Sequence, residues 1–186
     1  HNQWKYLVTI IAGFYIGASV NPLNCDYSSG NRNIIIQNNF NHLLLGELEH
    51  FFSISKPAVV FCTSKTFKNL LPLKKQLFYP AHIIIYDKHV PEAINFDDFL
   101  LHVDDTEVFT PVEVDTKEDI ALILTSSGTT GLPKCVQLSH SNFRLTMIYA
   151  GDPYFLDINN IDSLVGFLPF FHIFGNALAL ASLLYG

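Results

Sequence analysis

The part of the sequence best suited to chemistry lies in residues 122–134, where an apolar run ends abruptly in hydroxyl side chains and glycines. Gly128 and Gly131 allow the backbone to turn its N–H groups toward an anion, and Lys134 adds a positive charge. The candidate phosphate-binding residues are Thr125, Ser126, Ser127, Gly128, Thr129, Thr130, Gly131 and Lys134. Together they predict a loop that binds a phosphate group.

A Walker P-loop and an ordinary turn are the two alternatives for this segment. The Walker pattern requires Gly-Lys followed directly by Ser or Thr, whereas Lys134 follows Pro133 and precedes Cys135. The P-loop is therefore excluded, and a Ser/Thr/Gly turn with no ligand stays as the simpler alternative. Cys135 is expected to be a small apolar residue rather than a reactive nucleophile.

A second candidate is His172, in the pattern Leu168-Pro169-x-x-His172-x-x-Gly175. A single histidine among apolar residues is more often structural than catalytic. Its position in this pattern, downstream of the phosphate-binding segment, makes it a candidate catalytic residue together with Lys134.

Strands and helices must hold both candidates in place. The apolar run 120–124 predicts a strand that leads into the phosphate loop, and residues 135–138 predict a return strand. Ser139 or Ser141 can cap a following helix whose buried side carries Phe143, Met147 and Ile148. Residues 162–168 are predicted as a strand and residues 176–184 as a helix.

Upstream, helical and apolar segments alternate. The pattern predicts a helix at 4–15, a short strand within 17–22, and buried strands at 58–62 and 82–86 with helical segments before each. This alternation is typical of a layered α/β fold with mainly parallel sheets flanked by helices. The acidic residues between 97 and 119 are interpreted as a surface connection rather than a metal site, so no metal ligands are predicted.

Composition excludes several functions. The chain has 186 residues and a net charge of −6, without the basic cluster that nucleic-acid binding needs. The longest apolar segment, 6–20, is shorter than the roughly 20 residues that cross a bilayer, so no transmembrane segment is predicted. Three cysteines without metal-like spacing are interpreted as reduced thiols in an intracellular protein.

The string Ser-Ser-Gly-Thr-Thr-Gly-Leu-Pro-Lys at 126–134 resembles the phosphate-binding signature of the adenylate-forming superfamily. That superfamily includes acyl-CoA synthetases, coumarate-CoA ligases, beetle luciferases and the adenylation domains of peptide synthetases. Residues 168–175 resemble its second landmark, in which the histidine faces the carboxylate substrate and the α-phosphate. The resemblance implies that 1–186 is part of the large N-terminal AMP-binding domain, with 24–46 as an insertion and the C-terminal domain absent.

The resemblance also implies an activity. Such enzymes use ATP and Mg²⁺ to convert a carboxylic acid into an acyl-adenylate, release pyrophosphate, and usually transfer the acyl group to coenzyme A. A fatty or aryl acid is the expected substrate, and the chain by itself is expected to be inactive. Phe171 stands where beetle luciferases tend to carry a further histidine, which favours a ligase over a luciferase-like monooxygenase. A non-catalytic relative that has kept the fold is the remaining alternative.

Overall fold

The computed structural model describes residues 3–23, 48, 50–75, 80, 82–101, 108–126 and 134–185. The chain divides into two compact units. The first contains residues 1–24 and 110–186, and the second contains residues 25–109. The predicted insertion at 24–46 lies outside the described residues.

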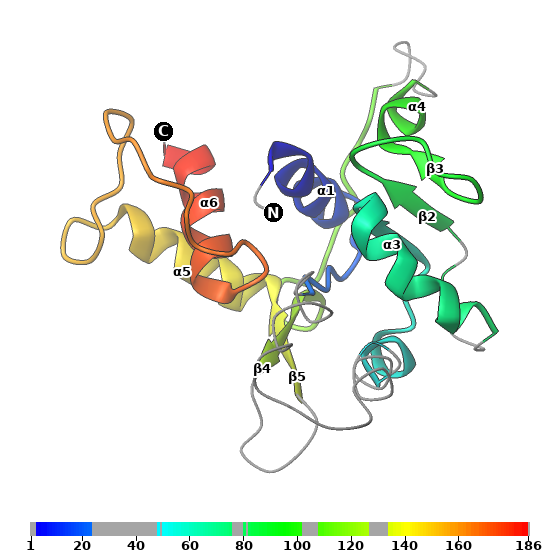
Figure 1. Ribbon diagram of the computed structural model, residues 1–186. Helices are drawn as coiled ribbons and strands as arrows, with labels where there is room; N and C mark the ends of the chain where they lie inside the picture. Colours follow the sequence, from blue (N-terminus) through cyan, green and yellow to red (C-terminus); the bar gives the residue numbers. More distant parts are fainter. Residues whose placement is uncertain are drawn as a thin grey trace, which may run out of the picture. The chain divides into compact units, whose positions relative to one another are not determined.

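The first unit is built on a β-hairpin. Strands β4 (Ile120–Ser126) and β5 (Lys134–Ser139) pair in antiparallel fashion (Figure 1), which confirms the predicted strand and its return. Helix α1 (Trp4–Tyr15) is also confirmed. The strand predicted within 17–22 is reduced to one parallel bridge, in which the backbone of Val20 bonds to Ala121 and Ile123 at 2.9 Å each.

Two helices follow the hairpin and lie side by side in Figure 1: α5 (His140–Gly151) and α6 (Ile173–Tyr185). Ser139 caps α5, because its hydroxyl accepts a hydrogen bond from the Asn142 N–H at 3.3 Å, and the Asn142 side chain accepts one from the Ser139 N–H at 3.2 Å. The predicted cap is therefore confirmed. Phe143 and Met147 are buried as expected, but Ile148 is 41% exposed.

One apolar core joins these elements. It contains Ile10 of α1, Leu122 and Leu124 of β4, Phe143, Met147 and Ala150 of α5, Ile158, and Ala177, Leu180 and Ala181 of α6. Fully burying one large aliphatic or aromatic side chain stabilises a fold by about 1.5–3 kcal/mol. The same core therefore supports both the hairpin that leads to the phosphate segment and the helix that follows His172.

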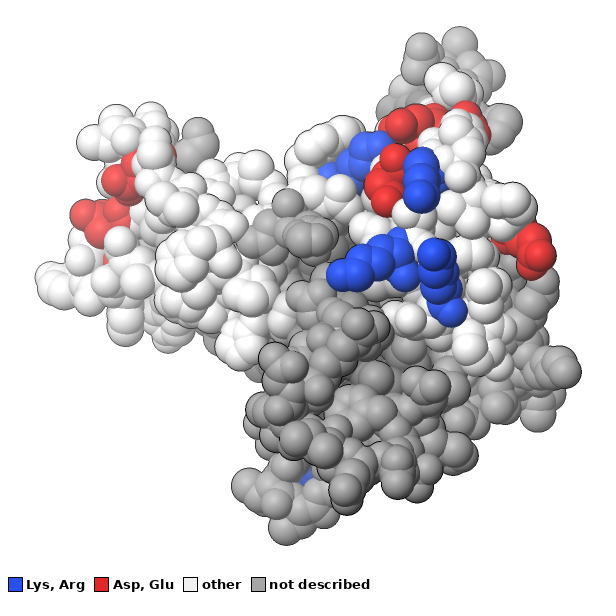
Figure 2. Space-filling model, viewed as in Figure 1, with Lys and Arg blue, Asp and Glu red and all other residues white. Residues whose placement is uncertain are grey.

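The strand predicted at 162–168 is absent. Residues 162–165 have no regular structure, and Val165 and Phe167 are 79% and 76% exposed. A strand needs a neighbour for its backbone groups, and no strand in the described part of the chain pairs with this segment. Figure 2 shows acidic side chains on the loop after α5, beside a mostly uncharged surface over α5 and α6.

The second unit contains a parallel three-stranded sheet in the order β1 (Val59–Cys62), β2 (His82–Ile85), β3 (Ile94–Asn95). The strands alternate with α3 (Ser64–Leu70), the 3₁₀ helix η2 (Leu71–Lys75) and α4 (Phe96–Leu100). Residues 50–55 are also helical. A small core forms on one face, where Ile84, Tyr86 and Phe96 are buried against Phe61. The predicted layered α/β fold is thus confirmed.

The acidic segment 97–119 begins in α4 and continues, beyond residues that are not described, as a mostly exposed stretch at 108–115. Its end is tied to α1, since the Val112 N–H donates to the carbonyl of Tyr15 at 2.9 Å. No group of three or more His, Cys, Asp or Glu side chains placed to hold a metal ion occurs among the described residues. Within the same residues, no helix is long and apolar enough to cross a membrane.

Candidate functional site

The end of the hairpin places a hydroxyl and an ammonium group across from each other. Ser126 is the last residue of β4 and pairs with Lys134, the first residue of β5. Directly opposed side chains in an antiparallel pair stand about 4.5–5.5 Å apart at their Cβ atoms, on the same face. Lys134 is exposed, so its charge is available to an incoming anion. The predicted residues Ser127, Gly128, Thr129, Thr130 and Gly131 lie outside the described residues.

The next pair along the hairpin is Thr125 with Cys135. The Cys135 side chain is half-buried, and burial raises its pKa. A raised pKa keeps the group as a neutral thiol at neutral pH, whereas the thiolate is the nucleophile. The structure therefore agrees with the expectation that Cys135 is a small packing residue.

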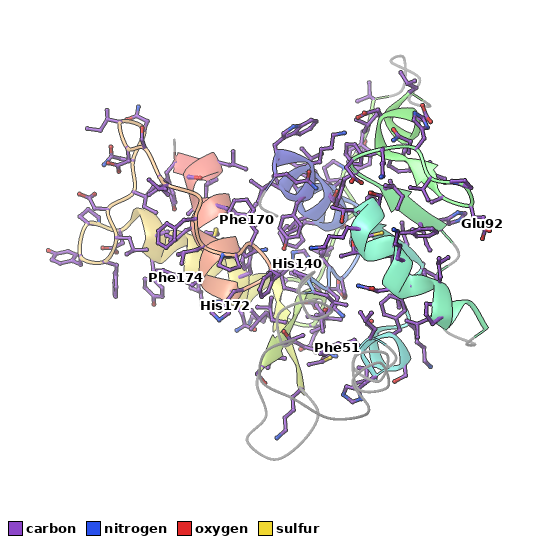
Figure 3. The ribbon with its side chains drawn as sticks, in the orientation of Figure 1. Phe51, Glu92, His140, Phe170, His172 and Phe174 are labelled. Atoms are coloured by element: carbon purple, nitrogen blue, oxygen red, sulfur yellow. The ribbon has the colours of Figure 1, made fainter. Side chains whose placement is uncertain are left out.

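His172 lies at the start of α6 (Figure 3), in a turn held by backbone hydrogen bonds. The His172 N–H donates to the carbonyl of Pro169 at 3.1 Å, and the His172 carbonyl accepts from the Asn176 N–H at 2.9 Å. The imidazole Nδ1 accepts a longer hydrogen bond, 3.4 Å, from the Phe174 N–H. The side chain thus acts as an N-terminal cap for α6.

This cap determines which imidazole nitrogen can donate. Because Nδ1 accepts a hydrogen bond, the neutral ring carries its proton on Nε2. The side chain is exposed, so Nε2–H is available as a donor to a ligand. The N-terminus of α6 also provides a partial positive charge that favours anions. The arrangement is suited to orienting a carboxylate.

Gly175 explains the glycine of the motif. A Cβ atom at this position would overlap the carbonyl oxygen of Pro169 and would lie 2.9 Å from its carbonyl carbon. Any larger residue would push the backbone of the turn away from α6. The pattern Leu-Pro-x-x-His-x-x-Gly is therefore a packing requirement as well as a chemical signature.

Two polar residues beside this turn are not predicted by any sequence motif. The carbonyl of Phe170 accepts hydrogen bonds from the Tyr6 hydroxyl at 2.8 Å and from Nδ2 of Asn176 at 3.1 Å. Asn176 is fully buried in α6, and Tyr6 is in α1. They are 170 positions apart in the sequence, and no spacing rule connects residues at such a distance. The signal in the sequence is Asn176 itself, an amide side chain near the start of an otherwise apolar segment.

Of the predicted site residues, the structure brings together Thr125, Ser126 and Lys134 on the hairpin. His172 stands on a separate element, and no hydrogen bond or ion pair joins it to Lys134 in the described part of the chain. Both elements rest on the core shared by β4, α5 and α6. The site thus consists of a cationic hairpin end and a donor histidine at a helix N-terminus, two features that attract anions.

A family model described as AMP-binding enzyme matches residues 1–186, the whole chain. The chain belongs to this family of adenylate-forming enzymes. Binding of ATP is a property of the superfamily. The family match confirms the resemblance inferred from the two motifs.

Individual relatives are named for two different activities. The chain is 33% identical over its full length to a luciferin 4-monooxygenase from Nipponoluciola cruciata, of which it covers 32%. It is 32% identical, over 58% of its length, to a long-chain-fatty-acid–CoA ligase from Bacillus subtilis, of which it covers 20%. The structure of a natural red-emitting luciferase from Phrixothrix hirtus matches 97% of the chain with a TM-score of 0.75 and 29% identity, and 32% of that luciferase is covered. The chain therefore spans about a third or less of the length of these relatives.

Proposed function

We propose that a protein containing this chain activates a fatty or aryl acid with ATP, forming an acyl-adenylate, and then transfers the acyl group to coenzyme A. The observation that carries the proposal is the pairing of Ser126 with an exposed Lys134 at the hairpin end, on the same core as His172. One element would supply cationic and hydroxyl donors for phosphates, and the other would supply an imidazole N–H donor for a carboxylate. Residues 1–186 are proposed to be part of the N-terminal AMP-binding domain of that protein.

Lys134 and the hydroxyl groups near it would hold the phosphates of ATP. When a carboxylate attacks the α-phosphorus, negative charge increases on the departing pyrophosphate. A fixed ammonium group and hydroxyl donors stabilise that charge without the reorganisation that water would need. Lys134 is exposed, and a bound nucleotide would cover it and strengthen this interaction by excluding solvent.

His172 would orient the substrate carboxylate. Its Nε2–H can donate to one carboxylate oxygen, leaving the other oxygen to attack phosphorus. Holding the carboxylate and the α-phosphate in the correct relative position accounts for a large part of the rate enhancement in such reactions. This proposal assigns Mg²⁺ as a cofactor and coenzyme A as a co-substrate, and the described residues contribute no metal cluster.

A luciferase-like monooxygenase is the second candidate. It is favoured by the luciferin 4-monooxygenase relative, which matches the whole chain, whereas the fatty-acid ligase matches 58% of it. Phe171, in place of a further histidine, favours the ligase. Both activities would use an acyl-adenylate, so the roles of Lys134 and His172 would be the same in each.

The experiment uses a full-length protein that contains residues 1–186, because the relatives are about three times as long as this chain. Acid-dependent exchange of pyrophosphate into ATP is measured with fatty and aryl acids, followed by consumption of coenzyme A and by light emission with luciferin. Exchange together with coenzyme A consumption supports the ligase. Light emission supports the monooxygenase, and no exchange with any acid supports a non-catalytic relative.

The proposal also includes an insertion at 24–46 and a peroxisomal or cytoplasmic location. Sequencing the transcript tests the insertion. A message in which the codons for Asn21 and Pro22 are followed almost directly by the codon for Glu47 would show that residues 24–46 are not part of the protein. The cellular location, peroxisomal or cytoplasmic, is tested by imaging a tagged full-length protein.

A further inference from the structure

Three groups close a small hydrogen-bonded network beside the His172 turn. The Tyr6 hydroxyl and Nδ2 of Asn176 both donate to the carbonyl oxygen of Phe170, at 2.8 and 3.1 Å. Nδ2 of Asn176 also donates to the Tyr6 hydroxyl at 3.3 Å. The rings of Tyr6 and Phe170 pack with their centroids 6.0 Å apart. The turn is thus held from α1 and from α6 at the same atom.

The amide of Asn176 is costly for the fold. The residue is 0% exposed, and its Oδ1 atom has no hydrogen-bond partner in the part of the chain that the structure describes. A buried polar atom without a partner destabilises a protein by the cost of removing it from water. Asn176 lies among the apolar residues of α6, where leucine would fit the surrounding pattern. Core packing alone does not account for an amide at this position.

We propose that Asn176 and Tyr6 are positioning residues that fix the 169–172 turn and thereby the direction of the His172 imidazole. Asn176 acts twice, since its backbone N–H donates to the His172 carbonyl at 2.9 Å and its side chain holds the Phe170 carbonyl. With both carbonyls fixed, the cap from the Phe174 N–H to Nδ1 keeps Nε2–H directed outward. The catalytic meaning of this inference rests on the proposed adenylation.

The test uses Tyr6→Phe, which removes only the hydroxyl, and Asn176→Leu, which removes the amide and keeps the number and branching of the side-chain heavy atoms. Tyr149→Phe is the matched control, because Tyr149 is a half-exposed tyrosine of α5 outside the network. We expect both network variants to lower kcat of pyrophosphate exchange by about tenfold or more, since a small misplacement of an orienting group has effects of this size. The KM for ATP should stay close to wild type, and Tyr6→Phe should remain folded at the assay temperature although it loses one hydrogen bond.

Double variants separate positioning from a general structural effect. If Tyr6 and Asn176 act through His172, adding either substitution to His172→Ala should lower exchange no further. A residue that only stabilises the fold would instead reduce activity by the same factor in both backgrounds. Full additivity with His172→Ala overturns the proposal.

A second readout does not depend on activity. Hydrogen exchange of the 168–176 peptide reports the amides of His172 and Asn176, which are both hydrogen-bonded in the turn. We expect faster exchange there in Tyr6→Phe and Asn176→Leu but not in Tyr149→Phe, and unchanged exchange overturns the positioning role. If the wild-type protein activates no acid, the proposed function fails by itself, and hydrogen exchange still decides whether the network holds the turn. If Asn176→Leu does not fold, Tyr6→Phe provides both readouts alone.

Discussion

Both units carry hydroxyl side chains where a strand ends, but the two sets are used differently. In the second unit, β1 is followed by Thr63 and Ser64. Thr63 forms a reciprocal cap with Thr66 at the start of α3, and Asp87 accepts hydrogen bonds from the Ser64 N–H at 2.7 Å and from its hydroxyl at 2.8 Å. The polar groups at this sheet edge therefore bind one another.

In the first unit, β4 ends at Ser126 beside a lysine instead of a carboxylate. Lys134 is exposed and forms no ion pair within the described residues. In the proposed site the Ser126 hydroxyl beside this lysine would be available to an external anion, whereas the Ser64 hydroxyl already donates to a carboxylate of the same fold. The difference between the two edges therefore lies in the charge beside the hydroxyl groups. Substitutions at both edges test this distinction, and their expected effects decrease from Lys134 to the cysteines.

Replacing Lys134 with alanine in the full-length protein should have the largest effect on catalysis. Removing one preorganised electrostatic donor typically costs about 2–4 kcal/mol of transition-state stabilisation. The thermal midpoint should be unchanged, because the side chain is exposed. The measurement is acid-dependent pyrophosphate exchange, with the exposed Lys117→Ala in the same unit as control. A wild-type exchange rate in Lys134→Ala would remove the hairpin end from the mechanism.

Replacing His172 with alanine should slow the same half-reaction by roughly ten- to a hundredfold, because the carboxylate is no longer oriented. Binding of ATP should be nearly intact, since the hairpin is unchanged. Transfer of the acyl group from synthetic acyl-adenylate to coenzyme A should also survive. Titration of ATP and single-turnover exchange separate these steps, and a loss of ATP affinity equal to the loss of rate contradicts the assigned role.

Replacing Gly175 with alanine tests the packing of the turn. The added methyl group would meet the backbone of Pro169, so we expect a loss of about 1–3 kcal/mol in the free energy of unfolding, typical of overpacking. Exchange activity should fall as well, because His172 moves with the turn. Gly166→Ala is the control, since its nearest neighbour would be the Phe170 ring at an ordinary 3.6 Å. Equal stability of the two variants would show that the turn can shift away from α6 at little cost.

Local sequence patterns predicted the elements that position the site. Helix α1, the strand ending at Ser126 and the cap at Ser139 depend on neighbouring residues, so periodicity and capping chemistry identify them. The strand expected at 162–168 was wrong, because strand formation depends on a partner elsewhere in the chain and none of the described strands pairs with it.

The candidate site could be predicted only in part, because local patterns report neighbouring residues and not tertiary contacts. Lys134 and His172 lie within short motifs, and the chemistry of each motif can be inferred from its own residues. The contact of Tyr6 with Asn176 and the Phe170 carbonyl joins the two ends of the chain. It depends on how α1 packs beside α6, which no local pattern reports. Such tertiary hydrogen bonds are visible only in the folded structure.

The occupied edge of the second unit should affect stability but not catalysis. Burial alone would raise the pKa of Asp87, but the hydrogen bonds from Ser64 and from the Asp87 backbone, together with the Lys88 charge, outweigh burial and lower the pKa. A carboxylate with a lowered pKa stabilises the folded state above about pH 4, and this contribution is lost as the pH falls through the folded-state pKa. Asp87→Asn should therefore cost at most about 1 kcal/mol at pH 7, because the group is exposed, and less at pH 3.

Thermal unfolding of Asp87→Asn is measured at both pH values, with the exposed Glu113→Gln as control. Pyrophosphate exchange should be unaffected in either variant. A loss of exchange in Asp87→Asn at wild-type stability would mean that this sheet edge also takes part in the reaction.

The two described cysteines provide the smallest effect, because each lies at one of the two edges. Burial raises the pKa of Cys62 to about 12 from its ordinary 9.0, partly offset by a hydrogen bond with Thr66, and burial also raises the pKa of Cys135. Since the thiolate is the reacting species, both thiols should alkylate more slowly at pH 8 than an exposed thiol, and Cys62 should be the slower of the two. Timed iodoacetamide labelling of a Cys25→Ser variant, followed by peptide mass spectrometry, gives both rates, with free N-acetylcysteine as reference. Faster labelling of Cys135 than of the reference would contradict this expectation. It would mean that the positive charge of Lys134 lowers the pKa of Cys135 more than burial raises it, and that the end of the hairpin is strongly electropositive.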